Sequence, residues 1–278
     1  PPRSTLFPYT TLFRSYILSG SELLAGSLRG RLTDEEQNVL RAIHQGGRRL
    51  HEIVQDLLDM ARIEANTCPI PRGKVHLPTL LAEVEQEFQA LFRERNLSFR
   101  IAPLPTVEIH GDARQLGKTF HRLVENAVKF TPEGGTIEVS GSLLHDRELR
   151  LREAQLRNFS TAFFTRPMPP RFMQLSIRDT GVGIDPAEQV RIFDKFYEVG
   201  PPDGHFTSRT SFGGKGVGLG LSLVKGVVEA HGGMTWVESP GTGETLGGSA
   251  FHLLLPLDPL PLEGSHEQLT SLSGHSPA

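Results

Sequence analysis

The chain has 278 residues, a formal net charge of −3 and 37% hydrophobic residues, which allows two domains with buried cores. This charge balance argues against a nucleic-acid-binding protein, whose binding face is usually strongly basic. The single cysteine, Cys68, excludes an internal disulfide and fits a reducing, cytoplasmic compartment. No run approaches the roughly 18 apolar residues that a membrane span requires.

A long amphipathic helix is predicted from about residue 34 to residue 65. Thr33 is a suitable N-cap, and Glu36 stands three residues later, where a capping box needs its second member. Apolar residues then recur mostly every three or four positions, apart from one turn occupied by Gly46 and Gly47. This stripe is typical of a helical bundle or coiled-coil seam, and by itself it indicates only self-association.

A second amphipathic helix is predicted from Arg114 to Phe130, again with apolar residues at helical spacing. Near its end, Asn126 and Lys129 are three residues apart, so they share one face of the helix. An amide oxygen is an acceptable magnesium ligand beside phosphate oxygens, and a lysine supplies a point charge to phosphate. The alternative is an exposed polar helix face with no ligand.

Two strands are predicted over residues 136–140 and 173–178, and the insertion between them, about residues 143–171, is unusually long. We expect this insertion to be a solvated excursion rather than a docking surface. The second strand leads into Asp179-Thr180-Gly181-Val182-Gly183-Ile184. A carboxylate at the end of a strand, beside glycines, can accept a hydrogen bond from an exocyclic amine such as adenine N6. In isolation, such a motif is more often a tight turn with a solvated Asp.

A glycine-rich run from Ser211 to Lys225 contains Gly216, Gly218 and Gly220 and then becomes a helix. Glycines let the backbone approach a ligand, and a helix start offers N–H groups and a positive dipole end to an anion. The run therefore predicts a phosphate cradle. It is neither a P-loop, which needs Lys-Ser/Thr after the last glycine, nor a Rossmann turn, which directly follows a strand.

The order of these motifs resembles the catalytic domain of sensor histidine kinases, in the Bergerat-fold ATPase superfamily. The matching segments are an N box (residues 125–130), a G1 box (179–184), an F box (193–196), a G2 box (216–221), His231-Gly232-Gly233-Met234 and the closing stretch 249–256. Upstream, residues 56–65 resemble the second helix of the family's dimerisation domain, and residues 16–24 resemble the end of its first helix. The resemblance covers roughly residues 16–256.

The resemblance implies an α+β fold: a two-layer α/β sandwich of the Bergerat type, preceded by a helical hairpin that forms half of a dimeric four-helix bundle. The implied segments are a partial dimerisation and phosphotransfer hairpin (16–66), a linker (67–76), an ATP-binding domain (77–256) with its lid at about 197–215, and a disordered tail (257–278).

The resemblance also implies a ligand and an activity. ATP and Mg²⁺ would be the cofactors, with Asn126 on the metal, Lys129 on phosphate and Asp179 on adenine. The implied nucleotide site consists of Asn126, Lys129, Phe130, Asp179, Gly181, Gly183, Ile184, Lys215, Gly216, Val217, Gly218, Leu219, Gly220 and Leu221. The γ-phosphoryl group would pass to a histidine and then to an aspartate of a response regulator. The implied partners are that receiver domain and a second copy joined through residues 16–65, with no nucleic acid.

Three positions depart from the family pattern: Arg122 stands where a second Asn is frequent, Val217 replaces the usual Thr, and Ala250 replaces a frequent Thr. Alternatives remain open. ATPases of the gyrase or mismatch-repair type use a Glu four residues before the N-box Asn, and Arg122 occupies that position. A non-catalytic scaffold for dimerisation and regulator docking is the second alternative. A serine-kinase cousin shares the boxes but usually lacks the preceding helices.

The front of the chain looks foreign. Residues 5–15 read, residue for residue, as the translation of a common short-read sequencing adapter, so we expect residues 1–15 to be an artefact. The family's phospho-accepting His lies in a His-Glu-Leu-Arg-Thr-Pro-like box, which is missing, and Pro8 stands near the aligned position. His44 and His51 lack the Arg-Thr-Pro stretch. We therefore expect a truncated kinase whose acceptor, sensor and any inner-membrane anchor lie outside this sequence.

Overall fold

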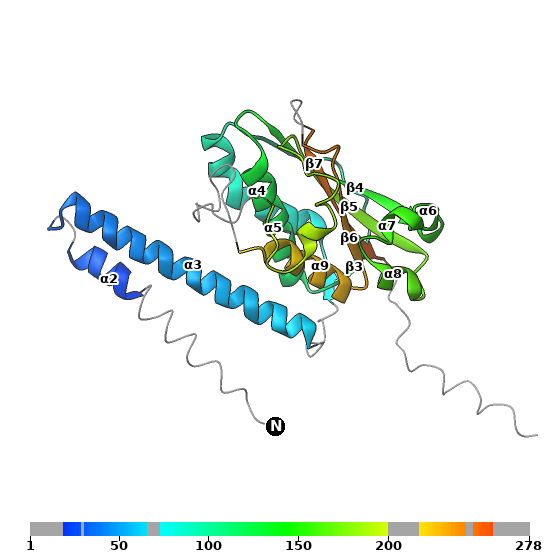
Figure 1. Cartoon of the computed structure of the whole chain (residues 1–278), viewed down its shortest axis with the longest axis horizontal. Coiled ribbons are helices and arrows are strands. Elements are labelled where there is room, and N and C mark those ends of the chain that lie inside the picture. Colours follow the sequence, from blue (N-terminus) through cyan, green and yellow to red (C-terminus); the bar gives the residue numbers. More distant parts are fainter. Residues whose placement is uncertain (1–18, 29–30, 66–72, 200–216, 243–246, 258–278) are drawn as a thin grey trace, which may run out of the picture. The chain divides into compact units, whose positions relative to one another are not determined.

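The computed structural model describes residues 19–28, 31–65, 73–199, 217–242 and 247–257, and the chain divides into two compact units, residues 1–65 and 66–278 (Figure 1). Some predictions lie outside the described residues: the foreign segment 1–15 with the acceptor position near residue 8, linker residues 67–72, lid residues 200–215, Lys215, Gly216 and tail residues 258–278. Among the helices within the described ranges, none has both the length and the apolarity needed to cross a bilayer.

The first unit contains helices α2 (Gly20–Ser27) and α3 (Asp34–Glu64), connected by a hydrogen bond between Ser21 Oγ and His44 Nδ1 at 2.9 Å. The predicted capping box of α3 is confirmed. The Glu36 N–H donates to Thr33 Oγ1 at 3.3 Å, and the Thr33 N–H donates to the Glu36 carboxylate at 2.8 Å. Along α3, large apolar side chains at intervals of four or seven residues remain at least 43% exposed: Val39, Ile43, Leu50 and Leu57.

The second unit is built on a five-stranded mixed sheet with the strand order β2-β4-β5-β7-β6. The strands are β2 (Ser98–Ile101), β4 (Thr136–His145), β5 (Arg171–Asp179), β6 (Met234–Glu238) and β7 (Ser249–Pro256). Only the β2–β4 pair is parallel among these. The register places Asp179 at the end of β5, opposite Ile137 on one side and Ser249 on the other.

A two-stranded ribbon, β1 (Gly73–Val75) with β3 (Ile109–Gly111), accompanies the sheet. The pairing means that residues 73–75, which were predicted as linker, are part of the second unit. At the other end, Leu257 is 8% exposed and its N–H donates to the Arg171 carbonyl at 3.1 Å. The packed structure therefore reaches one residue into the segment predicted as a tail.

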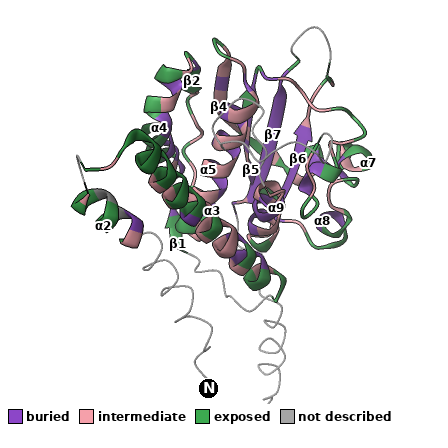
Figure 2. Cartoon of the chain, turned by 60° about the vertical axis from the view of Figure 1, so that its left-hand side comes forward, coloured by how far each residue is buried: buried purple, intermediate pink, exposed green. Residues whose placement is uncertain are grey.

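Helices α4 (Leu77–Glu94), α5 (Ala113–Phe130) and α9 (Gly220–Ala230) form a layer on one face of the sheet (Figures 1 and 2). The buried side chains of α5 recur every three or four residues, as the sequence predicted, and include Leu116, Phe120, Leu123 and Ala127. His231 connects two of these helices, because its Nε2 accepts from the Asp112 N–H at 3.0 Å while its Nδ1 bonds to the Val227 carbonyl at 2.7 Å. The start of α5 is thereby fixed to the end of α9.

The opposite face of the sheet is partly covered by the insertion, which runs from residue 146 to residue 170 between the paired strands β4 and β5. It forms three short helices, α6 (Asp146–Leu151), α7 (Glu153–Leu156) and α8 (Thr161–Thr165). They share one buried cluster with β5, β6 and β7: Leu149, Leu156, Phe163, Phe164, Phe172, Met234, Trp236 and Leu254. The expectation of a solvated excursion is wrong, because the outer face of the sheet offers apolar side chains that the insertion buries.

Polar and aromatic contacts fix the insertion further. Arg152 and Trp236 Nε1 both donate to Glu238 Oε1. The pKa of Glu238 is held well below its ordinary range, first by the His252 imidazole, whose Nε2 lies 3.6 Å from Oε2, although partial burial acts in the opposite direction. Phe159 packs against the buried cluster, and its ring also meets Phe193 of the 3₁₀ turn η2 (Arg191–Phe193) edge-on at 6.2 Å.

Candidate functional site

The end of α5 and the loop after β5 are joined through their backbones. The Val182 N–H donates to the Phe130 carbonyl oxygen at 3.2 Å. A Cβ atom added at Gly181 would lie 2.4 Å from that same oxygen, so only glycine fits this approach. The N box and the G1 box, about fifty residues apart in the sequence, therefore form one continuous edge.

Asp179 lies at the centre of this edge and is only 5% exposed. Its Oδ1 accepts hydrogen bonds from the N–H of Gly181 at 2.8 Å and of Ser249 at 3.2 Å. Burial raises the pKa of Asp179 to about 6, against the opposing effect of these two bonds and of the nearby Arg178 charge. Within the described part of the chain no hydrogen bond reaches Oδ2, so an acceptor atom is left for the amine of a ligand.

The loop between β6 and β7 closes the other side of the G1 box. Gly183 adopts a φ of 77°, and a Cβ atom added there would lie 2.3 Å from the Gly241 carbonyl oxygen. The Ile184 N–H donates to Ser239 Oγ at 2.9 Å. Both predicted residues, Gly183 and Ile184, therefore shape the site through close backbone packing.

Ser239, Gly248 and the backbone of Ser249 hold the site but were not predicted as site residues. Ser239 Oγ donates to the Gly248 carbonyl at 2.8 Å, and the Gly248 N–H donates to the Gly181 carbonyl at 3.0 Å. The Ser-Pro-Gly composition from residue 239 indicates a turn. It gives no sign of the partners of that turn, which lie more than fifty residues earlier in the chain.

Asn126 and Lys129 are half-buried residues in the last turns of α5. The Lys129 ammonium lies over the Phe130 ring, 4.7 Å from its centroid. The side chain of Asn126 makes no hydrogen bond to any part of the chain that the structure describes, so its amide oxygen is available to a ligand.

The described part of the G2 box begins at Val217 and leads into α9. Gly218 adopts a φ of 71°, its carbonyl accepts from the Phe196 N–H at 2.9 Å, and an added Cβ would lie 2.6 Å from the Phe196 backbone. Gly220 opens α9, and in the described part of the chain no atom beyond its neighbours and its own helix backbone lies within 4 Å of the position a Cβ would take. Leu219 is 2% exposed, so its side chain belongs to the core and only its backbone can face a ligand.

Lys215 and Gly216 lie outside the described residues, and Val217 and Leu221 are half-buried. The structure thus joins the N box to the G1 box by direct contacts. It places the start of α9, whose first N–H groups have no hydrogen-bond partner within the described residues, on a helix that packs against α5.

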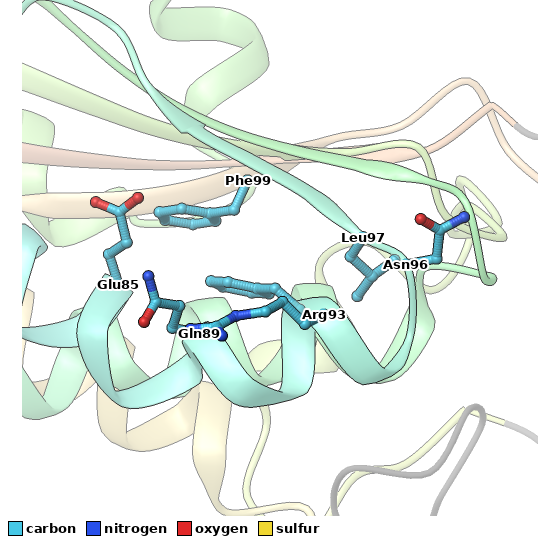
Figure 3. A pocket seen from close by; sticks show the side chains of 7 residues that line it. Glu85, Gln89, Arg93, Asn96, Leu97 and Phe99 are labelled. Atoms are coloured by element: carbon cyan, nitrogen blue, oxygen red, sulfur yellow. The ribbon is translucent and has the colours of Figure 1, made fainter.

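A separate hollow of about 430 Å³ lies between α4 and β2 (Figure 3). Its lining residues are Glu85, Gln89, Phe92, Arg93, Asn96, Leu97 and Phe99. The rings of Phe92 and Phe99 stack there with their centroids 4.6 Å apart. The predicted nucleotide-site residues within the described ranges are all absent from this lining, so the hollow is distinct from the site around Asp179.

Family models match most of the chain. Residues 111–259 match the histidine kinase-, DNA gyrase B-, and HSP90-like ATPase family, and the chain belongs to that family. Residues 16–66 match the His Kinase A (phospho-acceptor) domain. With this domain in front of the ATPase domain, the chain is a member of the sensor histidine kinases, and the family resemblance inferred from the boxes is confirmed.

Named relatives support this family assignment. The chain is 31% identical over 230 residues to the phosphate regulon sensor protein PhoR of Pseudomonas aeruginosa, covering 80% of this chain and 45% of PhoR. It is 30% identical over 249 residues to the histidine-protein kinase/phosphatase MprB of Mycobacterium avium, covering 87% of this chain and 40% of MprB. The chain therefore spans less than half the length of these two relatives.

Solved structures share the fold. Full-length ShkA in complex with AMPPNP has a TM-score of 0.65 at 24% identity, covering 91% of this chain and 44% of ShkA. Histidine kinase AdeS of Acinetobacter baumannii has a TM-score of 0.56 at 17% identity, covering 90% of this chain and 98% of that one. The predicted α+β fold, with helices in front of an ATPase domain, is confirmed. The insertion adds a partial third layer to its sandwich.

Proposed function

We propose that the chain binds Mg-ATP between its N, G1 and G2 boxes and serves as the catalytic part of a protein-histidine kinase. The observation that carries this proposal is Asp179. A buried carboxylate whose pKa burial raises to about 6 is costly to keep. An adenine amine that donates to Oδ2 would offset part of that cost. The complex of ShkA with AMPPNP is in line with a nucleotide at this fold.

The residues present fit a magnesium ion held jointly with the nucleotide. No group of three His, Cys, Asp or Glu side chains in the described ranges could hold a metal by itself. Asn126 offers an available amide oxygen, and phosphate oxygens and water would complete the octahedron that Mg²⁺ prefers. When bound, the ion would neutralise phosphate charge. Lys129 would place a positive charge beside the same phosphates.

Phosphoryl transfer depends on positioning and charge neutralisation more than on covalent help from the protein. In this proposal the N-terminus of α9 and the G2 glycines orient the phosphates, while Asp179 fixes the base. The γ-phosphoryl group would be presented to a histidine of the dimerisation helices and would pass from there to an aspartate of a receiver domain. The membership of the chain in the sensor histidine kinases supports this route.

The partner of the first unit is proposed to be a second copy of the chain. The exposed apolar positions of α3 at residues 39, 43, 50 and 57 follow the spacing of a coiled-coil seam. Two α2–α3 hairpins would bury these positions in a four-helix bundle, which the match to the His Kinase A domain supports.

Titration calorimetry with Mg-ATP tests the proposal. The chain, its Asn126→Ala variant and an Asn158→Ala control would be compared, because Asn158 is an exposed residue of the insertion. We expect binding by the chain and the control, and a loss of at least about tenfold for Asn126→Ala. If the unaltered chain does not bind, the scaffold alternative replaces the kinase.

A separate experiment tests whether the chain carries a histidine that accepts the phosphoryl group. The sequence holds no His-Glu-Leu-Arg-Thr-Pro-like box, so we expect no acid-labile label from γ-³²P-ATP on the chain alone. Label should appear once a helix carrying such a box is added. Acid-labile label on the chain alone would instead indicate that a histidine of this chain, such as His44 or His51, accepts the phosphoryl group.

A further inference from the structure

Arg95 connects the end of α4 to the end of α5. It is the residue that follows α4, and it is half-buried. Its Nη1 donates to the Val128 carbonyl at 2.5 Å, and its Nη2 donates to the Thr131 carbonyl at 2.8 Å. One guanidinium group therefore brackets Lys129 and Phe130, two residues of the predicted nucleotide site.

The end of a helix needs such partners, because the last four carbonyl groups have no partner within the helix. In α5, the Ala127 carbonyl accepts from the Thr131 N–H at 3.0 Å and from Thr131 Oγ1 at 2.6 Å. The Phe130 carbonyl accepts from the Val182 N–H. Arg95 supplies the donors for Val128 and Thr131, and its charge is favourable at the negative end of a helix.

The two ends of this network lie in different parts of the nucleotide site. On one side Arg95 holds the turn that carries Asn126 and Lys129. On the other side the Phe130 carbonyl meets the G1 loop only 2.4 Å from where a Cβ of Gly181 would be. A small rotation of the last turn of α5 would therefore move the metal and phosphate contacts most. It would also loosen the bond between Val182 and Phe130, whereas Asp179 is held by the N–H groups of Gly181 and Ser249 rather than by α5.

We propose that Arg95 is a positioning residue for the nucleotide site, which it serves by fixing the last turn of α5. The proposal rests on the nucleotide-binding function given above. Arginine suits this role because its rigid planar fork reaches two carbonyl groups at once, whereas a lysine ammonium is a single point. Arg95 itself touches no nucleotide in this account and acts through Asn126, Lys129 and Phe130.

Arg93 provides a matched control, because it lies two residues earlier on α4 and is exposed. Figure 3 shows it beside Gln89 at the hollow between α4 and β2, where it contributes to the lining. Substitution of Arg93 removes the same charge from the same helix end without touching α5.

Binding of two probes separates positioning from simple stabilisation. Mg-ATP would be titrated by calorimetry and adenosine by NMR chemical shift, at a temperature where every variant is folded. For Arg95→Met we expect about a tenfold loss of Mg-ATP affinity and less than a threefold loss for adenosine, because the phosphate end depends on α5. Arg95→Lys should recover part of the loss, and Arg93→Met should match the unaltered chain. Unchanged Mg-ATP affinity in Arg95→Met, or equal losses for both probes, would overturn the proposal.

Hydrogen exchange without nucleotide tests the positioning directly. In Arg95→Met, amide exchange should rise several-fold in residues 127–131 and at Val182, but not in β7. Equal protection in the variant and the unaltered chain would overturn the proposal even if Mg-ATP binding were altered. Failure of the unaltered chain to bind Mg-ATP would end the proposed function, whereas the exchange result would still decide whether Arg95 fixes the turn. If Arg95→Met does not fold, Arg95→Lys is measured in the same two ways.

Discussion

The two faces of the sheet in the second unit are built on opposite principles. On the helix side, backbone meets backbone at Gly181 and Gly183, and the carboxylate of Asp179 is buried at a cost. On the outer side, the insertion buries large side chains such as Phe163 and Trp236, each at most 2% exposed. The site edge of the first face gives up stability to keep groups ready for a ligand, although the rest of that face carries a core that includes Phe120 and Leu123. The second face supplies stability.

This difference gives substitutions on the two faces opposite signatures. A change on the outer face should lower the free energy of unfolding and leave nucleotide affinity alone. A change at the site should lower affinity with little loss of stability, or even with a gain. The following predictions, from the largest expected effect to the smallest, test whether the faces are independent.

Phe163→Ala should have the largest effect on stability. Phe163 is 2% exposed and packs on Phe164 and Phe172 at centroid distances of 5.2 and 5.7 Å. Removal of a buried Phe typically costs about 3–5 kcal/mol. Urea denaturation would measure this loss. Leu151→Ala, in the same insertion but at an 84% exposed position, is the control and should cost less than about 0.5 kcal/mol. A drop in Mg-ATP affinity of the folded Phe163→Ala variant would show that the faces are coupled.

Asp179→Asn should show the reverse signature. The amide is isosteric and can still accept the Gly181 and Ser249 N–H groups, but its NH₂ would oppose the amine of adenine. We expect about a hundredfold loss of affinity, about 2.7 kcal/mol. Above pH 6 the unfolding free energy should rise by about 1–3 kcal/mol, because a shift from 3.8 to about 6 is relieved. Calorimetry and urea denaturation on one preparation would check both, and a destabilised variant would contradict this account.

The features that could be predicted from the sequence are those that local sequence patterns encode. The capping box at Thr33 and the stripe of α5 are local and periodic signals, so they predicted their helices correctly. Asp179 could be identified as a candidate because its motif is contiguous and directly follows a strand.

The remaining site and packing features depend on partners far apart in the sequence. The Ser249 N–H reaches Asp179 across seventy residues, and Arg95 reaches Val128 and Thr131 across more than thirty. The sequence predicts a solvated insertion because the composition of the insertion does not reveal the apolar outer face of β5, β6 and β7 that it covers. Local patterns specify elements, whereas these contacts arise only when the sheet is assembled.

The pH dependence of adenosine binding tests the role of Asp179, because stability and affinity should change in opposite directions with pH. The ordinary pKa of Asp179 is 3.8 and burial raises it to about 6, so its contribution to stability is fully present below pH 4 and is lost as pH rises through 6. Affinity has the opposite trend, because the ligand amine prefers the ionised carboxylate. Adenosine, which has no group that titrates between pH 5 and 8, should lose affinity by about tenfold per pH unit below 6. An adenosine affinity that is constant from pH 8 to pH 5 would refute the role of Asp179.

The smallest effect is expected where the two faces meet, at Phe159. This insertion residue packs edge-on against Phe193, which in turn meets Phe251 of β7 at 6.4 Å. Such an aromatic pair contributes about 0.5–1.5 kcal/mol beyond its buried area. The contact also leads toward the G2 box, because η2 is followed by Phe196, whose N–H donates to the Gly218 carbonyl. Phe159→Leu keeps most of the volume and removes the edge-on contact, so we expect about a twofold loss of Mg-ATP affinity and about 1 kcal/mol less stability. Calorimetry and urea denaturation would measure both, with Leu151→Ala as the control from the same insertion. An affinity loss would identify this contact as the route by which the outer layer influences the nucleotide site, whereas unchanged affinity would confine the insertion to stability.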